Sequence, residues 1–194
     1  MDKTIAYYEQ HAKEFFNSTV SVDFKENQDK FIKGLHGKNI LDLGCGSGRD
    51  TKYFLGSGLQ VTAVDGSEEM CKYASEYTGI PVRKMMFQEL NEQGKFDGIW
   101  ACSSILHLSK KELRPVMIKM AAALHCGGLI YTSFKYGDFE GERNGRYFTD
   151  FTIDTFADFI KEIDNIKIED WCITGDARPG RGEEKWLNLL LRKI

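Results

Sequence analysis

The sequence lacks the features that mark a membrane-spanning, secreted or nucleic-acid-binding protein. No apolar run approaches the ~20 residues that a bilayer-spanning helix needs. The charged and aromatic start of the chain contains no apolar signal-peptide core. A net charge of −3 argues against a broad basic surface for phosphate backbones. We therefore expect a cytoplasmic protein with no membrane partner, for which nucleic acid is a disfavoured partner.

Paired cysteines are also missing. The five cysteines, Cys45, Cys71, Cys102, Cys126 and Cys172, are odd in number and widely spaced, and none forms a C-x-x-C pair. This pattern argues against a disulfide framework and a zinc site, so we expect reduced thiols and no metal. With 194 residues, 42% of them hydrophobic and 28% charged, the chain predicts one globular domain, monomeric or homodimeric, with a sizeable core.

What the sequence does contain is a glycine-rich turn between a short apolar strand and a helix. Residues 39–43 read as the strand, Gly44, Gly46 and Gly48 form the turn, and residues 49–55 read as the helix. Glycine has no Cβ, so the main chain of the turn can approach a ligand closely. The helix N-terminus adds free N–H groups. A strand–turn–helix unit of this kind holds a cofactor in doubly wound folds.

The details of the turn discriminate between cofactors. The dinucleotide fingerprint needs a glycine at its sixth position, where this chain has Arg49, and no Gly-Lys-Ser/Thr follows the turn as a P-loop requires. A second apolar strand, residues 59–64, ends in Asp65, about 20 residues after Gly44. An acid at that position can accept hydrogen bonds from both ribose hydroxyls. The pattern favours a nucleoside cofactor other than a dinucleotide.

Together these motifs resemble class I S-adenosylmethionine (SAM)-dependent methyltransferases, particularly small stand-alone bacterial members. The resemblance covers roughly residues 35–135, and it implies SAM as the methyl donor and S-adenosylhomocysteine (SAH) as the product. The stretches that carry it are the first motif at 41–48, the second at 64–67, the fourth strand and its exit at 97–100 and 106–108, and the turn at 124–129, where His125-Cys126 replaces the usual Lys-Pro.

The order of elements predicts an α/β fold. We expect a doubly wound, Rossmann-like, seven-stranded and mostly parallel sheet whose last strand is antiparallel, because the short loop before residues 186–192 leaves no room for a parallel crossover. The single domain divides into an N-terminal helical lid (1–36), a SAM-binding core (37–135) and a substrate-side region (136–194). The last region should hold a loop over 136–150, a helix over 152–163 and two strands over 166–173 and 186–192.

The candidate cofactor residues surround the turn and the strand ends. Asp42 should support the turn, while Gln88 and Glu89 follow the third strand, where this fold places the adenine. Cys102 and Ser103 follow the fourth strand and should face the methionine part. We interpret Cys102 as an ordinary buried cysteine rather than a nucleophile. The full predicted set is Asp42, Gly44, Cys45, Gly46, Gly48, Asp65, Gly66, Ser67, Gln88, Glu89, Cys102 and Ser103.

The flanks should supply the substrate side. Tyr7 and Tyr8 are candidates for an aromatic lid, although packing of their helix explains them equally well. His107 is a weak candidate for a general base, since no catalytic residue is secured by the sequence. Arginines present planar forks to carboxylates or phosphates, although solvated loop arginines are commoner. The candidates are Arg143, Arg146, Arg178 and Arg181.

The sequence therefore predicts a methyltransferase that acts on a small molecule, and the candidate arginines favour an anionic one. Two alternatives stay open: an RNA or protein methyltransferase, and a SAM- or SAH-binding regulator without transfer activity. An NAD-dependent oxidoreductase ranks third, because Arg49 occupies the place of the packing glycine.

Overall fold

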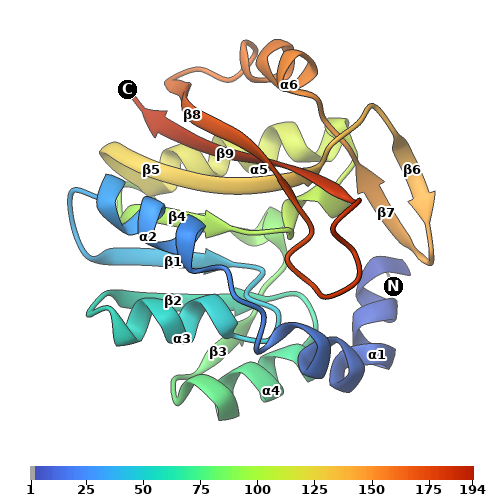
Figure 1. The fold of residues 1–194 in the computed structure, drawn as a ribbon. Coiled ribbons are helices and arrows are strands. Elements are labelled where there is room, and N and C mark those ends of the chain that lie inside the picture. The colour runs from blue at the N-terminus through green and yellow to red at the C-terminus, as the bar shows by residue number, and fades with distance from the viewer. Residues whose placement is uncertain (1–2) are drawn as a thin grey trace.

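A seven-stranded sheet forms the centre of the molecule. The computed structural model describes residues 3–194, and its strands lie in the order β3-β2-β1-β4-β5-β9-β8 (Figure 1). The pairs within β3-β2-β1-β4-β5 are parallel, whereas β9 runs antiparallel to both β5 and β8. The predicted Rossmann-like fold with an antiparallel last strand is therefore confirmed.

The elements follow the predicted alternation of strand and helix. The strands are β1 (Asn39–Leu43), β2 (Gln60–Asp65), β3 (Val82–Lys84), β4 (Phe96–Ala101), β5 (Leu124–Lys135), β6 (Glu140–Arg143), β7 (Arg146–Thr149), β8 (Ile166–Gly175) and β9 (Lys185–Lys193). The helices are α1 (Lys3–Thr19), α2 (Lys25–Gly34), α3 (Arg49–Gly56), α4 (Glu68–Thr78), α5 (Lys110–Ala123) and α6 (Ile153–Ile160), with short 3-10 turns η1 (Phe87–Glu89) and η2 (Ile105–His107).

Both faces of the sheet are covered because apolar side chains alternate along its strands. Leu41 and Leu43 of β1 join the core beneath α5 and α6, whereas Ile40 joins Phe31 of α2 and Phe54 of α3 on the opposite face. Burial of each such side chain stabilises the fold by roughly 1.5–3 kcal/mol. This two-sided core fixes the strand ends, where the glycine turn lies.

Local signals in the sequence start and stop the helices. The Ser67 hydroxyl accepts a hydrogen bond from the Met70 N–H at 3.2 Å and begins α4, while Gly79 ends it with φ +81°. Ser109 and Glu112 form a capping box at the start of α5. Within residues 3–194, no helix has both the length and the apolar character needed to cross a bilayer.

The prediction of a plain loop over 136–150 is wrong. This segment contains the β6–β7 hairpin, which stands apart from the central sheet beside α1 (Figure 1). Asn144 and Gly145 form its tip with φ +51° and +77°, and the Thr149 hydroxyl donates to the Leu108 carbonyl at 2.7 Å. Boundaries of the last elements also differ: α6 ends at Ile160 rather than 163, and β8 extends to Gly175 rather than 173.

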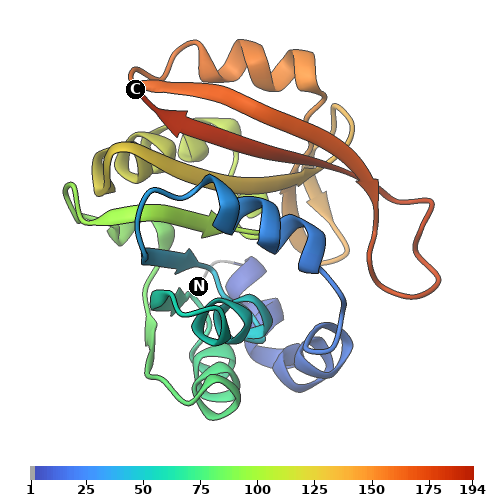
Figure 2. The same cartoon turned by 60° about the vertical axis from the view of Figure 1, so that its left-hand side comes forward.

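Helix α1 is attached to the start of α4 by hydrogen bonds. The Glu9 carboxylate accepts hydrogen bonds from the N–H groups of Glu68 and Glu69, at 2.7 and 3.2 Å. An acidic group at a helix N-terminus is favourable because it satisfies free N–H groups and interacts with the helix dipole. The loop between β8 and β9 projects beyond the sheet above α1 (Figure 2). Helix α1, the β6–β7 hairpin and the β8–β9 loop therefore surround one end of the sheet.

Candidate functional site

The glycine turn joins β1 to α3 in a backbone conformation that other residues rarely adopt. Gly44, Gly46 and Gly48 all have positive φ, at +83°, +54° and +77°. A Cβ on Gly44 would lie 2.5 Å from Cβ of Ser104, and one on Gly46 would lie 3.3 Å from the Phe15 ring of α1. The turn is thus confined between the end of β4 and α1, and Gly44 has no room for a side chain.

Asp65 holds this turn from the neighbouring strand. One carboxylate oxygen accepts a hydrogen bond from the Gly46 N–H and the other from the Ser67 N–H, both at 2.9 Å. Burial raises the pKa of Asp65, while these N–H donors oppose that rise. The acid at the end of β2 therefore lies directly beside the turn, as the sequence predicts.

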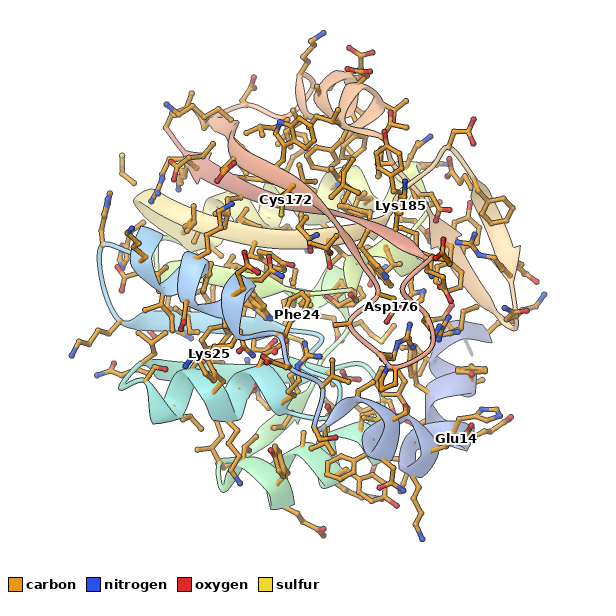
Figure 3. The ribbon with its side chains drawn as sticks, viewed as in Figure 1. Glu14, Phe24, Lys25, Cys172, Asp176 and Lys185 are labelled. Atoms are coloured by element: carbon orange, nitrogen blue, oxygen red, sulfur yellow. The ribbon has the colours of Figure 1, made fainter. Side chains whose placement is uncertain are left out.

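A cavity of about 200 Å³ opens above the turn, at the carboxyl ends of the parallel strands. Phe24, just before α2, and Asp176, at the base of the β8–β9 loop, line it (Figure 3). Of the residues predicted from sequence, those that line the cavity are Tyr8, Gly44, Cys45, Gly46, Asp65, Gly66, Gln88, Cys102, Ser103, His107, Arg146, Arg178 and Arg181. Those that do not are Tyr7, Asp42, Gly48, Ser67, Glu89 and Arg143.

Three of the predicted cofactor residues outside the cavity support its frame. Asp42 lies behind the turn and accepts a hydrogen bond from Thr51 at 2.5 Å. Burial, followed by the charge of Asp50, raises the pKa of Asp42 to about 8. Gly48 packs against α4, and Ser67 caps that helix.

The remaining three outside residues have other local partners. The Glu89 carboxylate accepts a hydrogen bond from the Met86 N–H at 2.7 Å and faces solvent. Arg143 pairs with Asp150 at 2.9 Å. Tyr7 stacks on His11 at 4.3 Å between ring centroids, and the central carbon of the Arg146 guanidinium lies 4.5 Å from the Tyr7 centroid.

The end of the cavity near α1 contains a phenol–imidazole pair. Nδ1 of His107 lies 2.6 Å from the Tyr147 carbonyl oxygen, which can only accept, so Nδ1 carries the hydrogen. Nε2 then accepts from the Tyr8 hydroxyl at 2.9 Å. Burial lowers the pKa of His107 to about 4 and raises that of Tyr8. Both groups are therefore neutral near pH 7.

Arg49 and Asp50 also line the cavity, and neither was among the site residues predicted from sequence. Asp50 accepts hydrogen bonds from Arg49, from Gln28 at 2.6 Å and from Trp100 at 2.8 Å. Arg49 also lies 3.9 Å from the Cys102 sulfur. The position of Arg49, at the start of the helix that follows the glycine turn, was a sequence signal that its side chain would lie beside the cavity.

Cys102 itself is a poor nucleophile. Burial raises the pKa of its thiol to about 12, so the thiolate is scarce at neutral pH. Its sulfur contacts the hydroxyls of Ser103 and Ser133 at 3.8 and 3.9 Å. Cys102, Ser103 and Ser133 thus form a polar part of the cavity lining. Across residues 3–194, no three His, Cys, Asp or Glu side chains gather in a way that could hold a metal ion.

Comparison with known proteins agrees with this geometry. The family model described as "Methyltransferase domain" matches residues 40–128. Ubiquinone biosynthesis O-methyltransferase of Dechloromonas aromatica is 31% identical over 106 residues, 51% of this chain and 45% of the relative. An uncharacterized methyltransferase of Staphylococcus carnosus is 24% identical over 168 residues, 78% of this chain and 81% of the relative. The chain spans about half the length of the first curated relatives that it matches.

Solved structures share the fold over nearly the whole chain. The 1,6-didemethyltoxoflavin-N1-methyltransferase of Burkholderia thailandensis, solved with its substrate and SAH, superposes with a TM-score of 0.77 at 23% identity and covers 97% of this chain and 85% of that one. The matched segment contains the glycine turn, Asp65 and the exit of β4, which form one part of the cavity lining. The family-model match over residues 40–128, these relatives and the shared fold together support a class I SAM-dependent methyltransferase.

Proposed function

We propose that this protein transfers a methyl group from SAM to a small molecule. The observation that carries the proposal is one cavity that joins two chemically different ends. The glycine turn and Asp65 form the cofactor end, whereas Tyr8, His107 and Arg146 lie at the acceptor end. A methyltransferase needs both ligands in one enclosed space, because its rate depends on holding the two reactants in line.

The cofactor end fits SAM. Gly44 and Gly46 leave main chain exposed where a Cβ would intrude, and Asp65 keeps lone pairs for the ribose hydroxyls beyond its two backbone hydrogen bonds. Met86 and Gln88 line the region after β3, which suits the adenine. When bound, SAM supplies an activated methyl group on a positively charged sulfur. Ser103 and Cys102 lie at the end of β4, where the methionine part would extend.

At the acceptor end, we propose that His107 accepts a proton through Tyr8. The neutral imidazole presents the lone pair of Nε2 to the Tyr8 hydroxyl, and that hydroxyl lines the cavity. An acceptor hydroxyl could give its proton to Tyr8 as Tyr8 gives its own to His107. The Tyr147 carbonyl would stabilise the resulting imidazolium through Nδ1. General-base assistance of this kind contributes typically 10²–10⁴-fold.

The acceptor that the cavity favours is small and anionic, and its reacting atom is a hydroxyl oxygen. Enclosure by α1, the β6–β7 hairpin and the β8–β9 loop supports a small molecule over a polymer. Positive side chains from two of these segments support an anion. The relatives named O-methyltransferases support oxygen as the accepting atom.

Calorimetry followed by a turnover screen tests this function. Purified protein should bind SAM and SAH with micromolar affinity, about −8 kcal/mol, and should not bind NADH. A library of small hydroxylated acids is then screened for SAH release. No heat with either cofactor, or binding of NADH instead, would overturn the proposal. Tight SAH binding without release from any library member would favour a regulator.

A further inference from the structure

Arg146 differs from every other cation in the cavity. Five cationic side chains line the cavity: Arg49, Lys135, Arg146, Arg178 and Arg181. Four of them have a carboxylate within 4.0 Å, supplied by Asp50, Asp176 or Glu184. Arg146 has no carboxylate within that distance anywhere in the described part of the chain. Among the described residues, Arg146 is therefore the one cation of the cavity whose charge no nearby carboxylate compensates.

The hydrogen-bonding groups of Arg146 are also largely unused. Its Nε is buried and has no partner, and its only hydrogen bond to residues 3–194 runs from Nη1 to the Tyr8 hydroxyl, at a long 3.3 Å. The edge formed by Nε and Nη2 is thus left without an acceptor. That edge is the part of a guanidinium that binds a carboxylate with two parallel hydrogen bonds.

Aromatic rings hold this guanidinium in place without neutralising it. Its central carbon lies 4.5 Å from the Tyr7 ring centroid, 5.2 Å from that of Phe148 and 5.7 Å from that of Tyr8. Cation–π contacts orient an arginine and partly replace its hydration, yet they supply no acceptor for its N–H groups. A buried donor without a partner is unfavourable, so a ligand that accepts from it gains affinity.

We infer that Arg146 is a carboxylate-binding subsite and that the carboxylate belongs to the methyl acceptor. This inference rests on the proposed function, since it assigns the second ligand of the same cavity. The cofactor's own amino-acid carboxylate is the other possible source of this chemistry. The substrate is the favoured source because Arg146 contacts Tyr8 and Phe148 at the acceptor end of the cavity. Arg49, and not Arg146, is the arginine that lies beside the glycine turn at the cofactor end.

Two matched variants test the subsite. Arg146→Gln removes the fork, and Arg143→Gln removes a neighbouring arginine of the same hairpin that already pairs with Asp150 and does not line the cavity. Sodium acetate and sodium benzoate are titrated at constant ionic strength into protein saturated with SAH. We expect millimolar binding to wild type and to Arg143→Gln, at least tenfold weaker binding to Arg146→Gln, and partial rescue by Arg146→Lys.

A second arm identifies the source of the carboxylate. SAH is compared with 5′-methylthioadenosine, which has the same nucleoside but lacks the amino-acid group. We expect Arg146→Gln to bind both as wild type does. A tenfold loss for SAH alone would assign Arg146 to the cofactor and overturn the inference. It would also be overturned if neither acid bound the SAH-saturated wild type, or if both glutamine variants lost binding equally. Failure of wild type to bind SAH would instead overturn the proposed function.

Discussion

Replacement of Asp65 by alanine should separate cofactor binding from folding. The carboxylate receives two backbone hydrogen bonds of 2.9 Å, and the proposed ribose contacts would use its remaining lone pairs. Hydrogen bonds to a charged group contribute about 1.5–3 kcal/mol, so SAM affinity should fall roughly 10- to 150-fold. The loss of an acceptor for the Gly46 and Ser67 N–H groups should also lower the free energy of unfolding by about 1–3 kcal/mol.

The assay is titration calorimetry with SAM and SAH, after circular dichroism has shown that each variant is folded. Asp158→Ala is a matched control, because Asp158 lies on α6, pairs with Lys161 across one helical turn and does not line the cavity. Its SAM affinity should equal that of wild type. Asp65→Asn keeps one acceptor oxygen and should be less destabilised than the alanine variant. A folded Asp65→Ala protein with normal SAM affinity would refute the ribose assignment.

Three further outcomes follow from the cavity and its frame. Gly44→Ala should lower the free energy of unfolding by roughly 2 kcal/mol or more in urea denaturation, because φ is +83° and the new Cβ would meet Ser104 at 2.5 Å. Gly56→Ala should not lower it, because a Cβ on Gly56 would have no neighbour within 4 Å. The free energy of unfolding should fall, on the order of a few kcal/mol, as pH rises from about 4 to 8, because the pKa of Asp42 is about 8 in the folded protein and lies above its unfolded value. The Asp42→Asn variant should show a flatter pH dependence. An unchanged slope in that variant would contradict the raised pKa of Asp42. Once a methyl acceptor has been identified, kcat/KM should decline below about pH 4 as His107 is protonated. The His107→Asn variant should turn over about 100-fold more slowly at unchanged SAM affinity. An unaffected rate would exclude His107 as the base.

The fold and the cofactor end could be predicted from sequence because their signals are local. The caps at Ser67 and Ser109 act within one helical turn, and the glycines act within their own turn. Asp65 reaches that turn from the adjacent strand, at a spacing from Gly44 that can be read from the sequence. The β6–β7 hairpin was missed because β6 consists of Glu, Gly, Glu and Arg, which have low strand propensity. Its Asn144-Gly145 tip was nevertheless a strong hairpin signal that could have located it.

The acceptor end could not be predicted in the same way. Four arginines look alike in the sequence, and their roles depend on which carboxylates the fold brings near them. Arg143 is paired with Asp150, and Arg178 with Asp176, whereas Arg146 has neither partner. Likewise, the tautomer of His107 depends on the Tyr147 carbonyl, which lies on a different element. The pairs of Arg143 and Arg178 are close in the chain, whereas the environments of Arg146 and His107 rest on contacts between segments far apart in it.

The separation of Tyr8 from its partners affects the order in which the cavity is completed during synthesis. Tyr8 leaves the ribosome early, but the side chains that it contacts follow 99 and 138 residues later, at His107 and Arg146. Contacts of α1 with α4 can form once α4 has been made, because Glu9 accepts hydrogen bonds from the Glu68 and Glu69 N–H groups, whereas the contact of Tyr8 with Arg146 must wait for the β6–β7 hairpin. A nascent chain that ends at β5 would already contain the turn and Asp65, and yet would lack the hairpin wall of the cavity. The cavity is therefore completed in stages during biosynthesis, with the glycine turn present before the hairpin wall.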